Sequence, residues 1–404
     1  MKPWLTIIGI GDDGLGGLAP ASRAILDTAE VIVGGARHLA MAPQVRAERL
    51  EWRQPFADSI AAIEARRGRR VVVLASGDPM WFGAGATLCR HFPREEMLVL
   101  PHPGAFSLAA ARLGWPLAEC PTLSLHARPL DALRLHLAER RRLLLLSEDG
   151  ATPAAVAALL TRTGWGPSRL TVLEHLGGEV ETAHSAKAAD WGDRRVADLN
   201  TIALECHAAS DTRGLPRLAG LPDEAFEHDG QLTKREVRAA TLAALAPLPG
   251  ELLWDVGAGC GSIAIEWLRA DAQLSAVAIE RDVARAAIIA RNAATLGVPN
   301  LEIVSGEAPA AFAELPAPDA VFVGGGLANP ALLPALWQAL KPGGRFVANV
   351  ISTDGERALY DWQAVHGGTL IRLAISRAEK LGAHLGWRAL APVTQFAVVK
   401  TRLR

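Results

Sequence analysis

The stretch Asp255-Val256-Gly257-Ala258-Gly259-Cys260-Gly261-Ser262 is the strongest indication of fold in this 404-residue chain. It lies between the apolar run 252–256, which is typical of a buried strand, and residues 262–270, whose apolar positions have the helical period. Glycines at such a turn let the backbone approach a ligand closely, and the N-terminus of the next helix favours a carboxylate or a phosphate. The stretch therefore predicts a ligand site at a strand-to-helix turn.

Two later features strengthen this interpretation. Glu280 ends the next predicted strand, where an acid can accept hydrogen bonds from ribose hydroxyls. Gly306-Glu307-Ala308 follows the third strand, a position from which it could contact the adenine ring of a cofactor. The turn, the acid and this triplet together favour a nucleoside-bearing cofactor over a purely structural loop. The G-x-G-x-G spacing departs from the dinucleotide pattern G-x-G-x-x-G, which favours S-adenosylmethionine over NAD.

The second half has the strand and helix alternation of a doubly wound, Rossmann-like α/β fold. Its C-terminal end differs from that of an all-parallel dinucleotide-binding fold. Two strand-like runs, 369–376 and 393–399, have no helix between them, which predicts an antiparallel terminal pair. Strands are otherwise predicted at 252–256, 276–280, 301–304, 320–323 and 345–350, and helices at 234–245, 262–270, 283–296, 330–340 and 355–366.

The first half is predicted to be mixed α/β. Short β-branched runs alternate with Ala-rich helical stretches, which indicates a largely parallel sheet, and later runs at 171–174, 180–185 and 201–206 suggest antiparallel, hairpin-like additions. Earlier strands are predicted at 5–10, 70–75, 97–100 and 143–147, and helices at 20–29, 57–67, 105–113 and 153–161.

The length predicts two domains. Residues 207–222 hold two glycines and two prolines without periodicity, so they indicate a linker between domains at 1–206 and 223–404. After it, Thr233 and Glu236 have the spacing of a capping box for the helix predicted at 234–245.

Glycine-containing turns also follow strands in the first half. Gly9-Ile10-Gly11-Asp12-Asp13-Gly14 fits G-x-G-x-x-G, but two carboxylates would repel a pyrophosphate, which argues against a dinucleotide loop. Ser76-Gly77-Asp78-Pro79 and Pro103-Gly104-Ala105-Phe106-Ser107 are more informative. Asp78 could pair with the cationic amine of a cofactor, although an ordinary Gly-Asp-Pro turn is the alternative.

The second half resembles the class I methyltransferases, and more narrowly the decarboxylating precorrin methyltransferases. The segments that carry this resemblance are Leu221-Pro222-Asp223-Glu224-Ala225-Phe226, Gly230-Gln231-Leu232-Thr233-Lys234-Arg235-Glu236-Val237-Arg238, Ile279-Glu280-Arg281, Val323-Gly324-Gly325-Gly326 and Leu340-Lys341-Pro342-Gly343-Gly344. It implies S-adenosylmethionine contacts at Thr233, Asp255, Gly257, Gly259, Gly261, Glu280 and Ala308, to which the adenine-end interpretation adds Glu307.

The first half resembles the tetrapyrrole methylases, which also use S-adenosylmethionine. Ser124-Leu125-His126-Ala127-Arg128 and Glu174-His175-Leu176-Gly177 carry the resemblance, and Val33-Gly34-Gly35-Ala36-Arg37-His38-Leu39 is similar to the branch that acts at carbon 5 of corrin precursors. It implies cofactor contacts at Gly9, Gly11, Gly77, Asp78 and Ser107. His126 and Arg128 are candidate substrate contacts, although a lone His near a strand end is more often structural.

Together the resemblances imply an enzyme of cobalamin biosynthesis with one S-adenosylmethionine site per domain. It would methylate carbon 5 with the first domain, methylate carbon 15 with the second, and decarboxylate the ring C acetate to give precorrin-8. Alternatives are another methylation step on a corrin intermediate, an NAD-dependent oxidoreductase, or a noncatalytic sensor. The polycarboxylate substrate requires local cations; the candidates are Arg128, Lys234, Arg235, Arg238, Arg372, Arg377, Lys380 and Arg388.

Composition limits the partners. The formal net charge of −1 gives no general attraction to nucleic acid or to anionic membranes. Four separated cysteines without a C-x-x-C pair argue against a zinc site or a disulfide framework and favour the cytoplasm, and no metal is expected. The run after Lys2 is too short for a signal peptide. We expect a homo-oligomer that binds a small-molecule tetrapyrrole.

Overall fold

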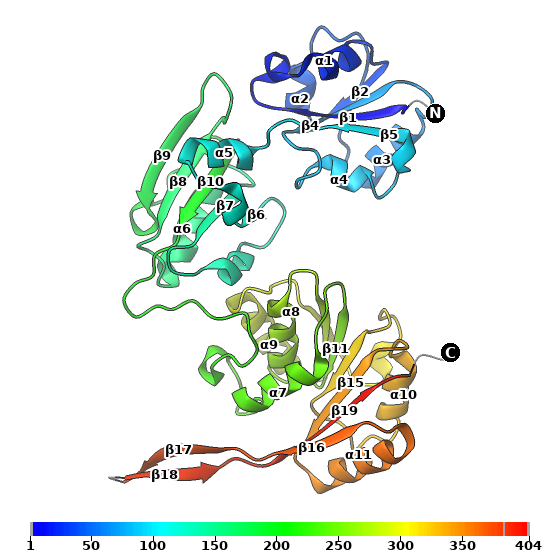
Figure 1. The fold of residues 1–404 in the computed structure, drawn as a ribbon, viewed down its shortest axis with the longest axis vertical. Helices are drawn as coiled ribbons and strands as arrows, with labels where there is room; N and C mark the ends of the chain where they lie inside the picture. The colour runs from blue at the N-terminus through cyan, green and yellow to red at the C-terminus, as the bar shows by residue number, and fades with distance from the viewer. Residues whose placement is uncertain (1–2, 383, 402–404) are drawn as a thin grey trace. The chain divides into compact units, whose positions relative to one another are not determined.

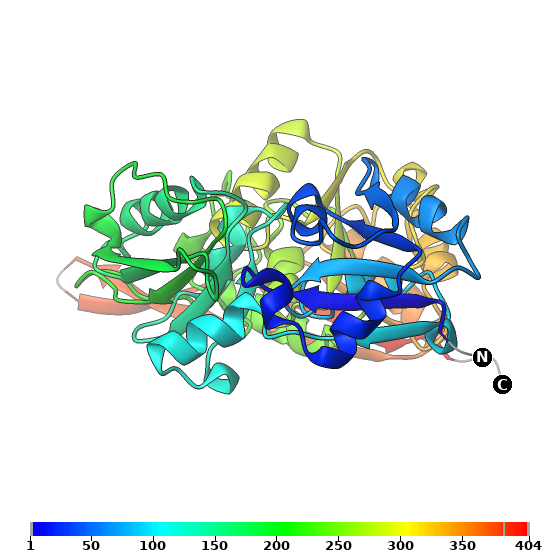
Figure 2. The same cartoon turned by 90° about the horizontal axis from the view of Figure 1, so that it is seen from above.

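The computed structural model describes residues 3–382 and 384–401. The chain forms two compact units, one of Met1–Arg128 with Ala138–Arg213 and one of Pro129–Leu137 with Gly214–Arg404. In the colour scale of Figure 1, most of the first unit runs from blue to green and most of the second from green to red; Figure 2 shows the same chain from above. Residues 129–137 interrupt the sequence of the first unit but belong to the second, because Leu135 packs against the core of the second unit.

The first unit begins with a parallel sheet of order β3-β2-β4-β1-β5. Two apolar clusters cover its faces: one includes residues of α3 and α4, and the other residues of α1 and α2. The elements are β1 (Leu5–Ile10), α1 (Pro20–Asp27), β2 (Val31–Gly34), α2 (Ala36–Ala40), β3 (Glu48–Glu51), α3 (Phe56–Glu64), β4 (Val71–Ser76), α4 (Ala84–Leu88) and β5 (Met97–Leu100).

A second sheet of the same unit has the order β6-β7-β10-β8-β9, and only its β6–β7 pair is parallel. The expected antiparallel strands are confirmed, but they join this separate sheet instead of extending a single parallel one. Its elements are α5 (Ala105–Leu113), β6 (Thr122–Ser124), β7 (Arg142–Leu146), α6 (Thr152–Arg162), β8 (Arg169–Glu174), β9 (Thr182–Lys187) and β10 (Asn200–Glu205).

The second unit contains a seven-stranded sheet of order β13-β12-β11-β14-β15-β19-β16. Its strands are parallel up to β15, and β19 is antiparallel to both β15 and β16, as predicted for the terminal pair. The elements are α7 (Arg235–Leu245), β11 (Leu252–Val256), α8 (Ser262–Ala270), β12 (Ser275–Glu280), α9 (Val283–Thr295), β13 (Glu302–Ser305), β14 (Ala320–Val323), α10 (Leu332–Ala339), β15 (Arg345–Val350), α11 (Thr353–His366), β16 (Thr369–Leu373) and β19 (Val393–Val399).

Two features of the second unit differ from the sequence prediction. The Gly-containing stretch before β19 forms a hairpin, β17 (Ser376–Leu381) paired with β18 (His384–Ala389), which extends beyond the sheet in Figure 1. The predicted capping box is wrong. Lys234 is the N-cap of α7 and makes no side-chain capping bond, while Glu236 pairs with Arg377 of the hairpin.

Residues 207–222 form neither helix nor strand, and each end is fixed to a different unit. In the first unit the Ala209 N–H donates to the Gly164 carbonyl at 2.8 Å. In the second, Leu221 is fully buried and its N–H donates to Glu266 at 2.9 Å. Within the described ranges, no helix has both the length and the apolar character needed to cross a bilayer.

Candidate cofactor and substrate sites

The second unit contains a cavity of about 660 Å³ at the carboxyl ends of β11, β14 and β15. This volume lies within the roughly 300–1,000 Å³ typical of ligand sites. Parallel strands place their carboxyl ends at one edge of the sheet, where open α/β folds bind their ligands. The loops after these strands line it with residues 257–260, 324–328 and 351–352, and the last two residues of β15 also belong to the lining. Residues 230–234 close another side.

The glycine turn has the backbone conformation that a cofactor loop needs. Gly257, Gly259 and Gly261 have φ of 68°, 61° and 80°, a region that L side chains rarely adopt. A Cβ on Gly259 would meet no atom within 4 Å, whereas one on Gly261 would lie 2.8 Å from Ile289. Gly257 and Gly259 line the cavity. Gly261 lies outside its lining and allows the turn to pack against α9.

Two buried carboxylates hold this turn from behind. Asp255 is fully buried, and its Oδ2 accepts the Ala264 N–H at the start of α8 at 2.9 Å. Burial, together with the charge of Glu280, raises the pKa of Asp255 to about 7, although the bond from Ala264 opposes the rise. Glu280 is also buried and accepts the Gly259 N–H at 2.8 Å. Through these bonds both acids shape the loop.

The remaining predicted cofactor residues divide by position. Thr233 lines the cavity, together with its neighbour Lys234. Glu307 and Ala308 follow β13 and do not belong to the lining, and Ala308 packs against an apolar cluster. The adenine-end interpretation of these two residues therefore stays a prediction.

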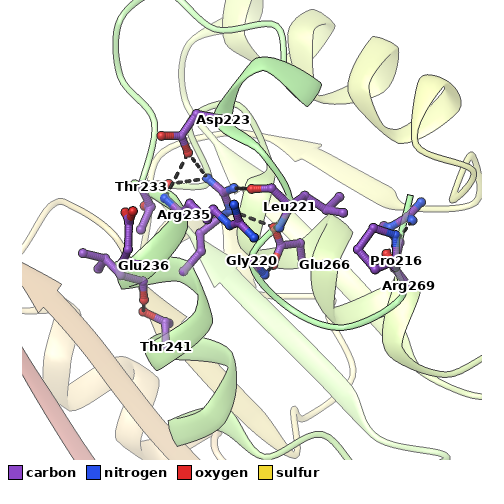
Figure 3. Close-up of polar contacts among 12 residues, drawn as sticks. Pro216, Gly220, Leu221, Asp223, Thr233, Arg235, Glu236, Thr241, Glu266 and Arg269 are labelled. Atoms are coloured by element: carbon purple, nitrogen blue, oxygen red, sulfur yellow. Dashed lines mark hydrogen bonds and ion pairs between the residues drawn. The ribbon is translucent and has the colours of Figure 1, made fainter. Parts of the chain in front are cut away.

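Arg238 was predicted to contact substrate, but the structure gives it a different role. Its side chain has no exposed surface. It donates to Glu266 Oε1 at 2.8 Å and to Asp223 Oδ1 at 2.9 Å, and also to the Thr233 and Leu221 carbonyls. Figure 3 shows these acceptors grouped around one guanidinium. Arg238 therefore anchors the segment that leads to the cavity and is not available to a carboxylate.

The other predicted cations lie in different surroundings. Arg377 pairs with Asp223 at 2.9 Å and with Glu236 at 2.6 Å, and these bonds raise its pKa. Arg235 is exposed at the start of α7. Arg372 pairs with Glu356, Arg388 pairs with Glu379, and Lys380 is exposed on the hairpin. Among the lining residues that the structure describes, Lys234 is the one cation.

The first unit has a smaller cavity, of about 160 Å³, between its two sheets. Gly11, Gly77, Asp78 and Ser107 line it, as the resemblance implies for cofactor contacts. Asp78 Oδ1 accepts the Met80 N–H at 2.9 Å, which stabilises the turn. Gly9 is not part of the lining. A Cβ there would lie 1.9 Å from the Gly77 carbonyl oxygen, so Gly9 allows β1 and the loop after β4 to approach closely.

A polar network at this cavity was not predicted from the sequence. Arg37 donates to Asp12 at 2.8 Å and to Ser76 at 3.2 Å, and Asp12 also contacts His175 Nδ1 at 2.9 Å. His38 Nε2 lies 2.9 Å from Ser76 Oγ. Burial, followed by the charge of Arg37, lowers the pKa of His38 to about 4. Arg37 thus offsets the negative charge of Asp12 beside the glycine loop.

His126 and Arg128 are both exposed, and neither is among the residues that line the cavity. The Arg128 guanidinium lies 5.0 Å from the centre of the Phe82 ring. Phe82 and its neighbours Met80 and Trp81 are 43–55% exposed. Arg128 therefore borders an apolar surface, and its contact with substrate remains a prediction.

The sequence interpretation also missed lining residues of the second unit. Gly324–Gly326, which carry part of the resemblance, and Asn349 line the cavity but are not among the predicted site residues. Gly324–Gly326 follow β14, and Asn349 lies at the carboxyl end of β15; both strands are parallel and have the predicted bounds. The available signal was therefore the rule that loops at the carboxyl ends of neighbouring strands form the site.

Comparisons with known proteins assign the two halves of the chain to two families. The family described as "Precorrin methyltransferase domain" matches residues 224–400, and the tetrapyrrole (corrin/porphyrin) methylases match residues 4–190. A precorrin-6Y C(5,15)-methyltransferase (decarboxylating) from Sinorhizobium sp is 50% identical over 99% of this chain and 97% of that protein.

Two shorter relatives each match less than half of this chain. A cobalt-precorrin-7 C(5)-methyltransferase from Salmonella typhimurium is 31% identical over 46% of this chain and 94% of that protein. A probable cobalt-precorrin-6B C(15)-methyltransferase (decarboxylating) from Pyrobaculum calidifontis is 34% identical over 43% of this chain and 92% of that protein.

Proposed function

Because the chain belongs to the family of the decarboxylating precorrin-6Y C(5,15)-methyltransferases, we propose that it methylates carbons 5 and 15 of a precorrin and removes the carboxyl group of the ring C acetate. The product would be precorrin-8, an intermediate of cobalamin biosynthesis. The observation that carries this proposal is the 50% identity to a protein of that name over 97% of its length. The chain is thus a C-methyltransferase with decarboxylase activity.

We assign one S-adenosylmethionine site to each unit. When bound, this cofactor supplies an electrophilic sulfonium methyl group. In the second unit, the open space beside Gly259 and the cavity volume fit such a ligand. In the first unit, Gly77 has φ of 54° and a Cβ there would lie 2.5 Å from Gly104 Cα, which makes glycine necessary.

The division of labour follows from the resemblances of the two halves. We assign carbon 5 to the first unit, whose Val33–Leu39 segment is similar to the carbon 5 branch, and carbon 15 and decarboxylation to the second. Two relatives named for single carbons, each matching less than half of the chain, support separate activities. The protein's task in both units is to align the reacting carbon with the methyl group and to exclude water.

Residues next to the two cavities are proposed to shape the cavity wall in the second unit and to bind a substrate carboxylate in the first. In the second unit, the buried contacts of Arg238 hold residues 221–233, whose end forms one wall of the cavity. In the first unit, Arg37 presents a guanidinium at the cavity, and a guanidinium suits a substrate carboxylate. Arg37 thus joins the candidate carboxylate contacts.

We also propose that the chain is a cytoplasmic homo-oligomer. All four cysteines are free, as a reducing compartment requires. Leu385 and Trp387 of the β17–β18 hairpin are 74% and 78% exposed, and an isolated two-stranded hairpin is marginally stable in water. Pairing with the hairpin of a second copy would bury both side chains.

The function is tested by incubating the full-length chain with precorrin-6Y and excess S-adenosylmethionine and analysing the products by mass spectrometry. We expect repeated turnover to a product that has gained two methyl groups and lost carbon dioxide. A product with one methyl group and its acetate intact would instead indicate another corrin methylation step. Binding of NADH in preference to S-adenosylmethionine would favour an oxidoreductase, and stoichiometric binding without turnover would indicate a sensor.

A further inference from the structure

A buried group of three polar side chains lies behind the cavity of the second unit. Thr241 comes from α7, Asn349 from β15 and Gln395 from β19, and Thr241 and Gln395 are almost completely buried. Asn349 Nδ2 is 2.8 Å from Thr241 Oγ1, and Gln395 Nε2 is 3.0 Å from Asn349 Oδ1 and 3.1 Å from Thr241 Oγ1. Of the three, Asn349 lines the cavity.

This network fixes the orientation of the Asn349 amide. The Thr241 hydroxyl donates its proton to the Val237 carbonyl at 2.8 Å, so it can only accept from its other neighbours. The amide group of Asn349 that faces Thr241 must therefore be the NH₂ group. Since this group has two N–H donors and Thr241 takes one, the second is left for a ligand in the cavity.

The charge of the cavity wall is unusual for a polycarboxylate substrate. Its described lining contains one cation, Lys234, and one anion, Asp354, and no arginine. Arg238 forms ion pairs with Glu266 and Asp223, and Arg377 forms ion pairs with Asp223 and Glu236. Arg235, which follows Lys234 directly, is exposed and is not part of the lining. A carboxylate that enters this cavity beside Asn349 therefore meets a neutral donor.

A neutral donor suits decarboxylation. The bond between the acetate methylene and its carboxylate breaks, carbon dioxide leaves, and the electron pair enters the conjugated macrocycle. The methylene carbon then takes a proton from solvent and becomes a methyl group. Negative charge leaves the carboxylate in the transition state, so a strong ion pair would stabilise the reactant more than the transition state. A single neutral N–H orients the group with less of this effect.

We propose that Asn349 donates the hydrogen bond that orients the departing acetate, and that Thr241 and Gln395 are positioning residues that hold its amide. The proposal rests on the proposed function, because it assigns the decarboxylation to this cavity. It predicts that changes at Asn349 reduce the release of carbon dioxide more than the transfer of the carbon 15 methyl group.

The test uses the full-length chain with Asn349→Leu and Asn349→Asp, precorrin-6Y and S-adenosylmethionine. Both variants lose the N–H donor, and we expect carbon dioxide release to fall about tenfold to hundredfold, in line with the cost of a misplaced reacting group. Methyl transfer should fall by less than about threefold, so that a methylated product with an intact acetate accumulates. The proposal would be overturned if either variant released carbon dioxide at the wild-type rate, or if decarboxylation and methyl transfer fell by the same factor.

Thr241→Val tests the positioning role without changing the cavity wall. It removes the acceptor of the Asn349 amide, so we expect a selective, smaller loss of carbon dioxide release that Thr241→Ser restores. The Thr241 variants also test the proposal if Asn349→Leu fails to fold. Calorimetric binding of S-adenosylmethionine shows whether that variant is folded.

If Lys234→Met selectively abolishes the release of carbon dioxide while the Asn349 and Thr241 variants do not, the lysine holds the acetate instead. Failure of the unmodified chain to release carbon dioxide would refute the proposed function.

Discussion

Arg238 of α7 forms a buried ion pair with Glu266 of α8. Both side chains have at most 1% exposed surface, and Glu266 also accepts the Gly220 and Leu221 N–H groups. In the sequence Arg238 stands in a run with Lys234 and Arg235, which resembles a patch for an anionic substrate. Whether a helical cation faces solvent or the interior depends on tertiary packing, and Glu266 lies in another helix, 28 positions later.

Arg238→Met should destabilise the second unit strongly. Removing the guanidinium leaves the buried Glu266 without its cation and leaves Asp223 with Arg377 alone. Breaking a buried pair in this way costs about 3–5 kcal/mol. Arg235→Met is the matched control, because Arg235 is exposed in the same helix and the effect should stay within about 0.5 kcal/mol. Urea unfolding of both full-length variants measures the difference, and similar midpoints for the two would contradict the buried role.

Asp255 should make the stability of the second unit depend on pH. Its folded-state pKa, raised to about 7 by burial, lies above that of an unfolded aspartate. The folded chain therefore keeps a proton that the unfolded chain releases, so stability falls as the pH rises from about 4 to about 7. Asp255→Asn removes this loss while its amide oxygen can still accept the Ala264 N–H.

Thermal unfolding at several pH values measures this effect. The melting temperature of Asp255→Asn relative to the unmodified chain should increase between about pH 5 and pH 8. Exposed Glu302 is the control, and Glu302→Gln should keep the wild-type pH profile. If the difference in melting temperature between Asp255→Asn and the unmodified chain does not change with pH, the pKa of Asp255 is not raised.

At the scale of elements, hydrophobic period predicted most of the buried strands, but it missed the short strand β2, whose four residues are all buried. β1, β11, β14 and β15 have the predicted bounds, because their apolar runs are buried on both faces. β3 was missed because it lies at a sheet edge and three of the four residues in its sequence Glu-Arg-Leu-Glu are charged. The β17–β18 hairpin was missed for a related reason: it forms a two-stranded sheet of its own, and none of the hairpin residues whose burial is described is buried.

The hairpin also allows a prediction about assembly. Leu385 and Trp387 lie two positions apart and therefore share one face of the ribbon, while Arg388 points to the other. Charging the first face with Leu385→Asp and Trp387→Lys should convert the proposed oligomer to monomers, because burying the two side chains would drive the pairing. Light scattering after gel filtration measures the mass. Arg388→Gln should leave it unchanged, and a monomeric unmodified chain would contradict the proposal.

At the scale of the whole molecule, the sequence indicated two glycine-turn sites because each follows a buried strand whose position was predictable. It did not indicate that residues 129–137 belong to the second unit. That assignment depends on Leu135, whose backbone nitrogen and Cγ would each lie 2.9 Å from a Cβ on Gly297. The sequence positions of Leu135 and Gly297 are too far apart for a local pattern to connect them.

Two donor sites in separate units should be separable within the intact chain. Gly77→Val places a branched side chain at positive φ against Gly104 and should block the first site, whereas Gly259→Val fills the open space of the second. Calorimetry should show two bound equivalents of S-adenosylmethionine for the unmodified chain and one for each variant.

The products formed from precorrin-6Y distinguish the two units. Gly77→Val should still release carbon dioxide and add one methyl group, whereas Gly259→Val should not release carbon dioxide. Retention of carbon dioxide release by Gly259→Val with its loss in Gly77→Val would reverse the assignment of the units, and a single equivalent in the unmodified chain would refute the two sites.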